Sequence, residues 1–140
     1  MHVIASSFAD PADVAAFKRA KARGLSDTQA FAVGDNGIGF WGDNTAQTTT
    51  PMCALPPEDM IERYGFVHKA ARKPVLVTYK GRSITCILAD RMPHRANIKN
   101  GAGIDLNPAA IAQLGLPKGA MVVMDWRWAD EGGELKSPNT

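Results

Sequence analysis

Few residues of this chain can bind a metal or form a cross-link. The 140-residue sequence has two cysteines, Cys53 and Cys86, and three histidines. No pair of these residues has the short spacing of a structural zinc site, so we expect no metal. Two cysteines allow one disulfide, but buried free thiols are also common in strands. Both states of the pair remain open at this point.

Neither sign of charge dominates the chain, and no apolar run is long. The formal net charge is +2, which gives no reason to expect nucleic acid as a partner. No apolar run approaches the length of a membrane span. The first residues lack the basic region and apolar core of a secretory signal. We expect one globular domain over residues 1–130, a polar tail at 131–140, and a monomer.

The glycine-rich segment 37–42 matches a dinucleotide fingerprint in its letters alone. Asp43 and Asn44 follow it where a nucleotide site needs an apolar helix, so we expect no cofactor. The acidic residues of the segment also lack the spacing of a calcium-binding EF-hand loop. We interpret the segment as a turn-rich wall of a binding groove. Trp41 is then either a platform for a sugar ring or a core residue.

Apolar periodicity and turn residues predict short strands and short helices. Strands are expected at 2–8, 74–79, 82–89 and 120–128. Helices are expected at 10–24, 26–32, 57–65 and 107–115. Asp10 and Asn107 are the predicted N-caps of the first and last helix. The basic outer face of the first helix either contacts an anionic polymer or is simply solvated. Trp126 and Trp128 share one side of the last strand and are expected in the core.

The stretch from Ile84 to Leu114 carries the strongest pattern. An apolar strand delivers Asp90 into a polar turn, Asp90–Arg95. Farther on, Asp105 follows Ile104 and lies two residues before Asn107, the predicted cap of the last helix. Each aspartate thus lies at the end of a strand-like piece beside a tight connection, as catalytic carboxylates often do.

This order of pieces resembles the double-psi β-barrel of the rare lipoprotein A group, which are septal lytic transglycosylases of peptidoglycan. Expansins, family 45 glycoside hydrolases and transglycosylases of the lytic transglycosylase A type share that barrel. The resemblance covers Val75 to about Val123, and more loosely residues 5–8 and 54–56. It implies a mainly β fold with short helices, namely a six-stranded double-psi β-barrel with an inserted N-terminal helix. Met52 stands where the lipoprotein A group has a site histidine.

The resemblance implies an enzyme that cleaves the glycan backbone of peptidoglycan or a related polysaccharide, most simply a lytic transglycosylase. The lipoprotein A group has its catalytic acid at the position of Asp90, whereas the lytic transglycosylase A type and family 45 enzymes have it at that of Asp105. A transglycosylase needs one carboxyl group that is still protonated near neutral pH. An inverting hydrolase needs a second carboxylate roughly 6.5–9.5 Å away.

The residues beside each aspartate suggest different roles for the two. Apolar Ile104 and Leu106 should raise the pKa of Asp105, and the charge of Arg91 should lower that of Asp90. We therefore expect Asp105 to be the proton donor and Asp90 its ionised partner. The structural alternatives are a helix-capping role for Asp105 and a simple ion pair between Asp90 and Arg91.

The remaining polar residues of this region suit substrate binding. His94, Arg91 and Arg95 are candidates, because arginine pairs well with the carboxylates of peptide stems. Asp43 lies roughly where the lipoprotein A group has an acidic residue. Asp43 and Trp41 are therefore two further candidates for substrate binding. The alternatives are a non-catalytic, expansin-like glycan-binding module and a cysteine peptidase that uses Cys53. Either way, we expect action at the cell wall, in the periplasm or outside the cell, after delivery by a route other than a visible signal peptide.

Overall fold

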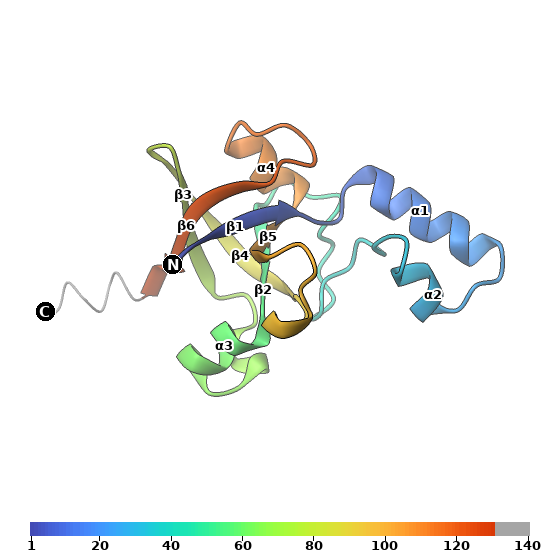
Figure 1. Ribbon diagram of the computed structural model, residues 1–140, viewed down its shortest axis with the longest axis horizontal. Helices are drawn as coiled ribbons and strands as arrows, with labels where there is room; N and C mark the ends of the chain where they lie inside the picture. The colour runs from blue at the N-terminus through green and yellow to red at the C-terminus, as the bar shows by residue number, and fades with distance from the viewer. Residues whose placement is uncertain (131–140) are drawn as a thin grey trace, which may run out of the picture.

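The computed structural model describes residues 1–130, which form a closed barrel of six strands (Figure 1). The strands are β1 His2–Ser7, β2 Met52–Leu55, β3 Pro74–Tyr79, β4 Arg82–Arg91, β5 Ala102–Leu106 and β6 Val122–Trp128. They follow one another around the barrel in the order β1-β5-β2-β4-β3-β6. The β1–β5 and β2–β4 pairs are parallel and the other pairs antiparallel. This mixed closed barrel confirms the predicted fold class and is consistent with a double-psi barrel.

Alternating residues of the strands fill the barrel. Its interior includes Leu55, Leu88 and Leu106, which are fully buried. Trp126 and Trp128 are each 4% exposed and pack edge to face, with ring centres 5.4 Å apart. Their predicted place in the core is confirmed. Cys53 and Cys86 are buried free thiols, so they behave as small apolar residues in the packing.

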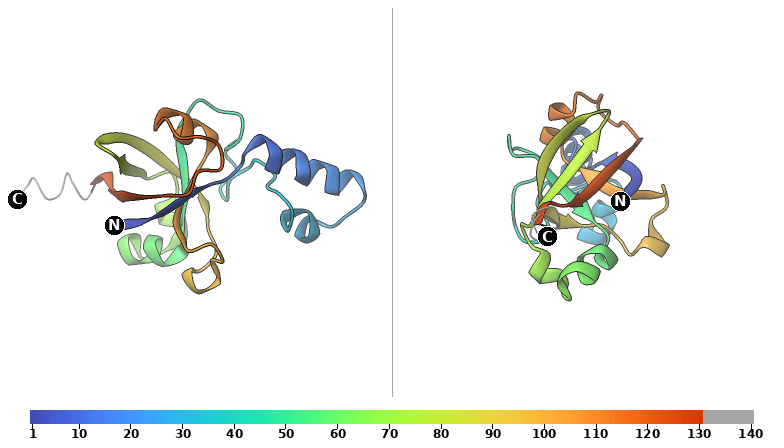
Figure 2. Two further views of the ribbon diagram at one scale, coloured as in Figure 1. Left: turned by 45° about the horizontal axis from the view of Figure 1, so that its top comes forward. Right: turned by 90° about the vertical axis from the view of Figure 1, so that its left-hand side faces the viewer.

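Short helices join the strands. They are α1 Pro11–Ala22, α2 Asp27–Phe31, α3 Pro57–Tyr64 and α4 Pro108–Gln113, with 3-10 turns η1 Val67–Ala70 and η2 Arg95–Asn97. As predicted, α1 follows β1. Together α1 and α2 project from one side of the barrel, as Figure 1 and the left view of Figure 2 show. The rings of Phe17 and Phe31 join the two helices at 4.7 Å between centres. No helix within residues 1–130 is long and apolar enough to cross a membrane.

Two local predictions need correction. Asp10 holds the N-cap position of α1, but its side chain makes no capping bond. Its carboxylate instead accepts a hydrogen bond of 2.8 Å from the Ser7 hydroxyl. Strand β4 also continues through Asp90 and Arg91, which were expected in a turn, because they pair with Ala54 and Leu55 of β2.

Asn107, by contrast, caps α4 as predicted. Its side-chain oxygen accepts from the backbone N–H of Ala110 at 3.0 Å. The same oxygen accepts from the N–H of Met52, and the amide nitrogen donates to the carbonyls of Thr45 and Thr50. This buried side chain therefore ties the start of β2 and the 45–50 loop to α4. The predicted tail at 131–140 lies outside the described residues.

Candidate functional site

Asp90 and Asp105 lie in one row of side chains that crosses four strands. Ser6 of β1 pairs with Asp105 of β5, Asp105 pairs with Ala54 of β2, and Ala54 pairs with Asp90 of β4. The strand neighbours of Ser6, Asp105 and Ala54, such as Ala5, Leu106 and Cys53, belong to the buried core cluster. Because side chains alternate along a strand, the row lies on the outer face of the barrel. The structure thus brings together the two predicted aspartates.

The strand spacing sets the separation of the two aspartates. Ala54 stands between them, so two spacings of about 4.8 Å put their Cα atoms roughly 9–10 Å apart. The methyl group of Ala54 is buried, and the residue is 3% exposed. It packs in a small apolar cluster with Phe8, Ala9, Met92 and Ala102. We call this cluster the alanine patch.

Asp105 is half-buried at the edge of a pocket. The Ser6 hydroxyl donates a hydrogen bond to its carboxylate. Burial raises the pKa of Asp105 to about 6, although the Ser6 bond opposes the shift and the charge of Asp35 adds to it. The pocket has a volume of about 310 Å³, and its other lining residues are Met92, Pro93, Asn97, Ile98, Lys99 and Asn100. A carboxyl group that has a pKa of about 6 and opens into a pocket can donate a proton near neutral pH.

The pKa of Asp90 differs from the expectation. Burial raises its pKa to about 6 as well, against the effect of the Arg91 backbone N–H, which donates to its carboxylate at 2.8 Å. The prediction that Arg91 lowers this pKa is wrong, since no ion pair joins the two side chains within residues 1–130. The Arg91 guanidinium instead lies over the ring of Phe40, 4.5 Å from its centre. The two aspartates therefore have similar pKa values, and each contacts a different hydrogen-bond donor.

A third carboxylate, Asp35, approaches the pair from the loop after α2. Its charge raises the pKa of both Asp90 and Asp105, and burial raises its own pKa. Gly39 allows this loop to approach β4, because a Cβ there would lie 2.2 Å from the carbonyl oxygen of Ala89. Sequence reasoning did not select Asp35. The one local signal was the run of glycines, which permits such a close approach.

Aromatic and charged side chains line the flank beside Asp90. The rings of Phe40 and His68 are stacked at 5.6 Å, and Trp41 donates from Nε1 to His68 Nδ1 at 3.0 Å. Phe40 is 41% exposed. Arg72 binds the carboxylate of Asp43 through two nitrogens, at 3.0 and 3.2 Å. The predicted residues Arg91, Trp41 and Asp43 thus lie on one flank, but Asp43 is held by Arg72.

His94 and Arg95 lie elsewhere and contact α3. His94 Nδ1 is 3.2 Å from a carboxylate oxygen of Glu58. The Arg95 guanidinium pairs with Asp59, whose side chain is 2% exposed. These partners fix the 93–97 segment to the start of α3. Within residues 1–130, no hydrogen bond or ion pair joins either side chain to Asp90 or Asp105.

The geometry gives less support to a metal site or to a cysteine nucleophile. Within residues 1–130, no group of three or more His, Cys, Asp or Glu side chains is placed to hold a metal. Burial raises the pKa of the Cys53 thiol well above its usual range, and Cys86 bonds to it. A thiol that stays protonated and enclosed is a poor nucleophile.

No protein-family model matches the chain, and no curated protein matches it significantly.

Proposed function

We propose that this protein cleaves the glycan backbone of peptidoglycan by acid catalysis, as a lytic transglycosylase similar to the rare lipoprotein A group. The observation that carries the proposal is the row in which Asp105 and Asp90 flank Ala54, each with a pKa of about 6. An ordinary aspartate, with a pKa near 4, is almost fully ionised at neutral pH. A pKa near 6 leaves roughly a tenth of the acid protonated at pH 7.

Asp105 is the better candidate for the acid, because it opens into the pocket and because its partner, the Ser6 hydroxyl, can accept from the protonated carboxyl group as well as donate to the ionised one. The backbone N–H that donates to Asp90 stabilises its ionised form. In a transglycosylase, Asp105 gives its proton to the glycosidic oxygen as the bond to C1 of the sugar breaks. The carboxylate then takes the proton of the 6-hydroxyl as that oxygen bonds to C1, which restores the acid and leaves an anhydro end. The negative charge of Asp90 would stabilise the developing oxocarbenium ion.

A non-catalytic, expansin-like glycan-binding module is the second candidate. The exposed stack of Phe40 and His68 beside Arg91 supports it, because aromatic faces bind sugar rings without chemistry. The substitution of Met52 for the site histidine of the lipoprotein A group also favours it.

Digestion of purified sacculi with mass analysis of the products separates the candidates. Soluble fragments with anhydromuramic ends are the expected result. Reducing ends would instead mean hydrolysis, in which Asp90 activates water. If the folded protein binds sacculi that stay intact, the glycan-binding module is the supported candidate. If it neither binds nor dissolves sacculi, both candidates are contradicted.

A further inference from the structure

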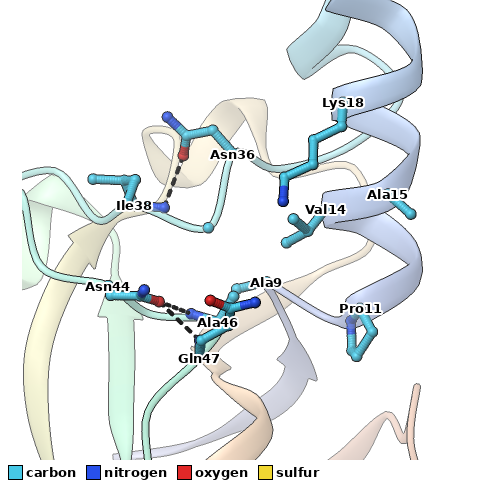
Figure 3. A pocket seen from close by; sticks show the side chains of 11 residues that line it. Ala9, Pro11, Val14, Ala15, Lys18, Asn36, Ile38, Asn44, Ala46 and Gln47 are labelled. Atoms are coloured by element: carbon cyan, nitrogen blue, oxygen red, sulfur yellow. Dashed lines mark hydrogen bonds between the residues drawn. The ribbon is translucent and has the colours of Figure 1, made fainter.

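A second pocket, of about 430 Å³, lies between α1 and the 36–47 loop (Figure 3). Its size is within the range of roughly 300–1,000 Å³ typical of small-ligand sites. The reaction proposed above does not use it. Its lining residues come from α1, from the turn before α1 and from the loop: Ala9, Pro11, Val14, Ala15, Lys18, Asn36, Gly37, Ile38, Asn44, Ala46 and Gln47.

Close backbone contacts fix the loop wall of this pocket against α1. A Cβ at Gly34 would lie 2.1 Å from the carbonyl oxygen of Asp13, so only glycine lets the loop approach the helix so closely. The N–H of Gly37 donates to Asp35 at 2.6 Å, and its carbonyl accepts from Thr45 at 2.9 Å. The pocket is therefore preformed, which reduces the entropy cost of binding.

The amide side chains of the wall are left as hydrogen-bond donors. Asn36 Oδ1 accepts from the N–H of Ile38 at 2.9 Å, and Asn44 Oδ1 accepts from the N–H of Gln47 at 2.8 Å (Figure 3). Because the backbone partners can only donate, the atom that meets them must be the amide oxygen. Within residues 1–130, neither amide nitrogen donates a hydrogen bond.

Lys18 adds a positive charge to these donors. Figure 3 shows its side chain reaching from α1 toward the pocket, beside Val14. No ion pair involves Lys18 within the described part of the chain, whereas Lys21 of the same helix pairs with Asp27 at 2.8 Å. None of the described residues that line the pocket is acidic. A cation, amide donors and the apolar sides of Val14 and Ile38 together suit a sugar ring that carries a carboxylate.

This pocket and the pocket of Asp105 border the same apolar cluster, the alanine patch. Ala9 belongs to the alanine patch, and Ala46 packs on that patch. Met92 of the same patch, and Ile98 packed on it, line the Asp105 pocket. The two pockets thus border one buried apolar cluster, which also contains Ala54.

We propose that the pocket beneath α1 is a second saccharide subsite, which binds a sugar with a free carboxylate through Lys18. The inference rests on the proposed function, because it treats the two pockets as parts of one glycan site. In peptidoglycan the carboxylate has two sources, the lactyl group of muramic acid in strands without peptides and the ends of the stem peptides.

Calorimetric titration of the full chain with three oligosaccharides tests the subsite. The probes are a muramyl tetrasaccharide without peptides, the same tetrasaccharide with stem peptides, and neutral chitotetraose. We expect a muramyl probe to bind about tenfold more tightly than chitotetraose, the scale of one charge-assisted hydrogen bond. The preferred muramyl probe identifies the source of the carboxylate. Mass analysis after each titration checks that the ligand is intact.

Two matched variants locate the effect. Lys18→Gln should abolish the preference, whereas Lys21→Gln removes the same charge from the same helix and should keep it. Both positions are exposed, so circular dichroism should show native folding. The subsite is overturned if the wild-type chain binds no probe or binds all alike, or if Lys18→Gln keeps the preference. Equal losses in the two variants would overturn it too, because they would mean a general charge effect. If the preference depends on Lys18 but sacculi stay intact, cleavage is the part that fails and the subsite stands.

Discussion

The Ser6 hydroxyl donates a hydrogen bond to the Asp105 carboxylate across the parallel β1–β5 pair. This bond stabilises the ionised form and so opposes the burial that raises the pKa of Asp105 to about 6. Ser6 thus holds the pKa of this group down, in a range where both protonation states are populated near neutral pH.

Substitution of Ser6 should therefore shift the pH dependence of activity upward. In Ser6→Ala the ionised carboxylate loses a donor, so its pKa rises and the alkaline limb of the pH–rate profile moves up by as much as about one unit. Turbidity loss of sacculi at a series of pH values measures the limb. Ser7→Ala is the control, because Ser7 donates to Asp10. A downward shift in Ser6→Ala would contradict the assignment.

The two aspartates should differ in their effect on turnover. Asp105→Asn keeps the shape of the side chain and its acceptor for Ser6, but it cannot donate an acidic proton. We expect its activity to fall by a factor of about 10² or more, in line with loss of a general acid. Release of muropeptides per unit time is the measurement. Near-native turnover in Asp105→Asn with an inactive Asp90→Asn would reverse the roles, and full activity in both would remove the pair from the mechanism.

Asp35 lies outside the row of Asp90 and Asp105, but its charge should affect the pKa of both carboxyl groups. Its charge raises the pKa of Asp90 and of Asp105, so Asp35→Asn should lower both values. The alkaline limb then moves down, and activity at pH 7 decreases while activity at low pH persists. The asparagine oxygen can still accept from Gly37, which keeps the loop in place. Asp27→Asn, on exposed α2, should leave the profile unchanged; an equal shift there would point to a general effect of net charge.

The raised pKa values also predict how stability depends on pH. Since Asp90 and Asp105 hold their protons more tightly folded than unfolded, their contribution to stability is complete below about pH 4 and is lost as the pH rises through about 6. Asp105→Asn removes one such group. It should raise the free energy of unfolding at pH 8 by about 1–3 kcal/mol relative to wild type, and by much less at pH 4. Urea denaturation at the two pH values measures the difference, and a variant less stable at pH 8 would contradict it.

Asn107 should be one of the most sensitive positions for folding. It is fully buried and bonds to Met52, Ala110, Thr45 and Thr50. Asn107→Ala leaves these backbone groups without their partner and should cost about 3 kcal/mol of stability. Thermal and urea denaturation test this. Exposed Asn97→Ala is the control and should change stability by less than about 0.5 kcal/mol.

Local patterns in the sequence were enough to predict the four strands β1, β3, β4 and β6 and the four α-helices. The period of two placed Trp126 and Trp128 on one side of β6, and Asn107 with Pro108 marked the start of α4. Such signals work because the residues that set them are neighbours along the chain. The same reasoning chose Asp105 for its apolar neighbours, and its pKa is indeed raised by burial. Its failure at Asp10 also has a local cause, since the competing donor, Ser7, lies just before the helix.

Only the tertiary structure decided what surrounds each charged side chain. Arg91 is adjacent to Asp90 in the sequence, yet its guanidinium stacks on Phe40, which comes from a distant loop. Arg95 was expected at the substrate but pairs with Asp59 of α3, and Asp35 reaches the aspartates across the glycine-rich loop. Electrostatic and hydrogen-bond energies depend on distance in space and on burial. Both are fixed only when the barrel closes and brings β4, β5 and the loops together.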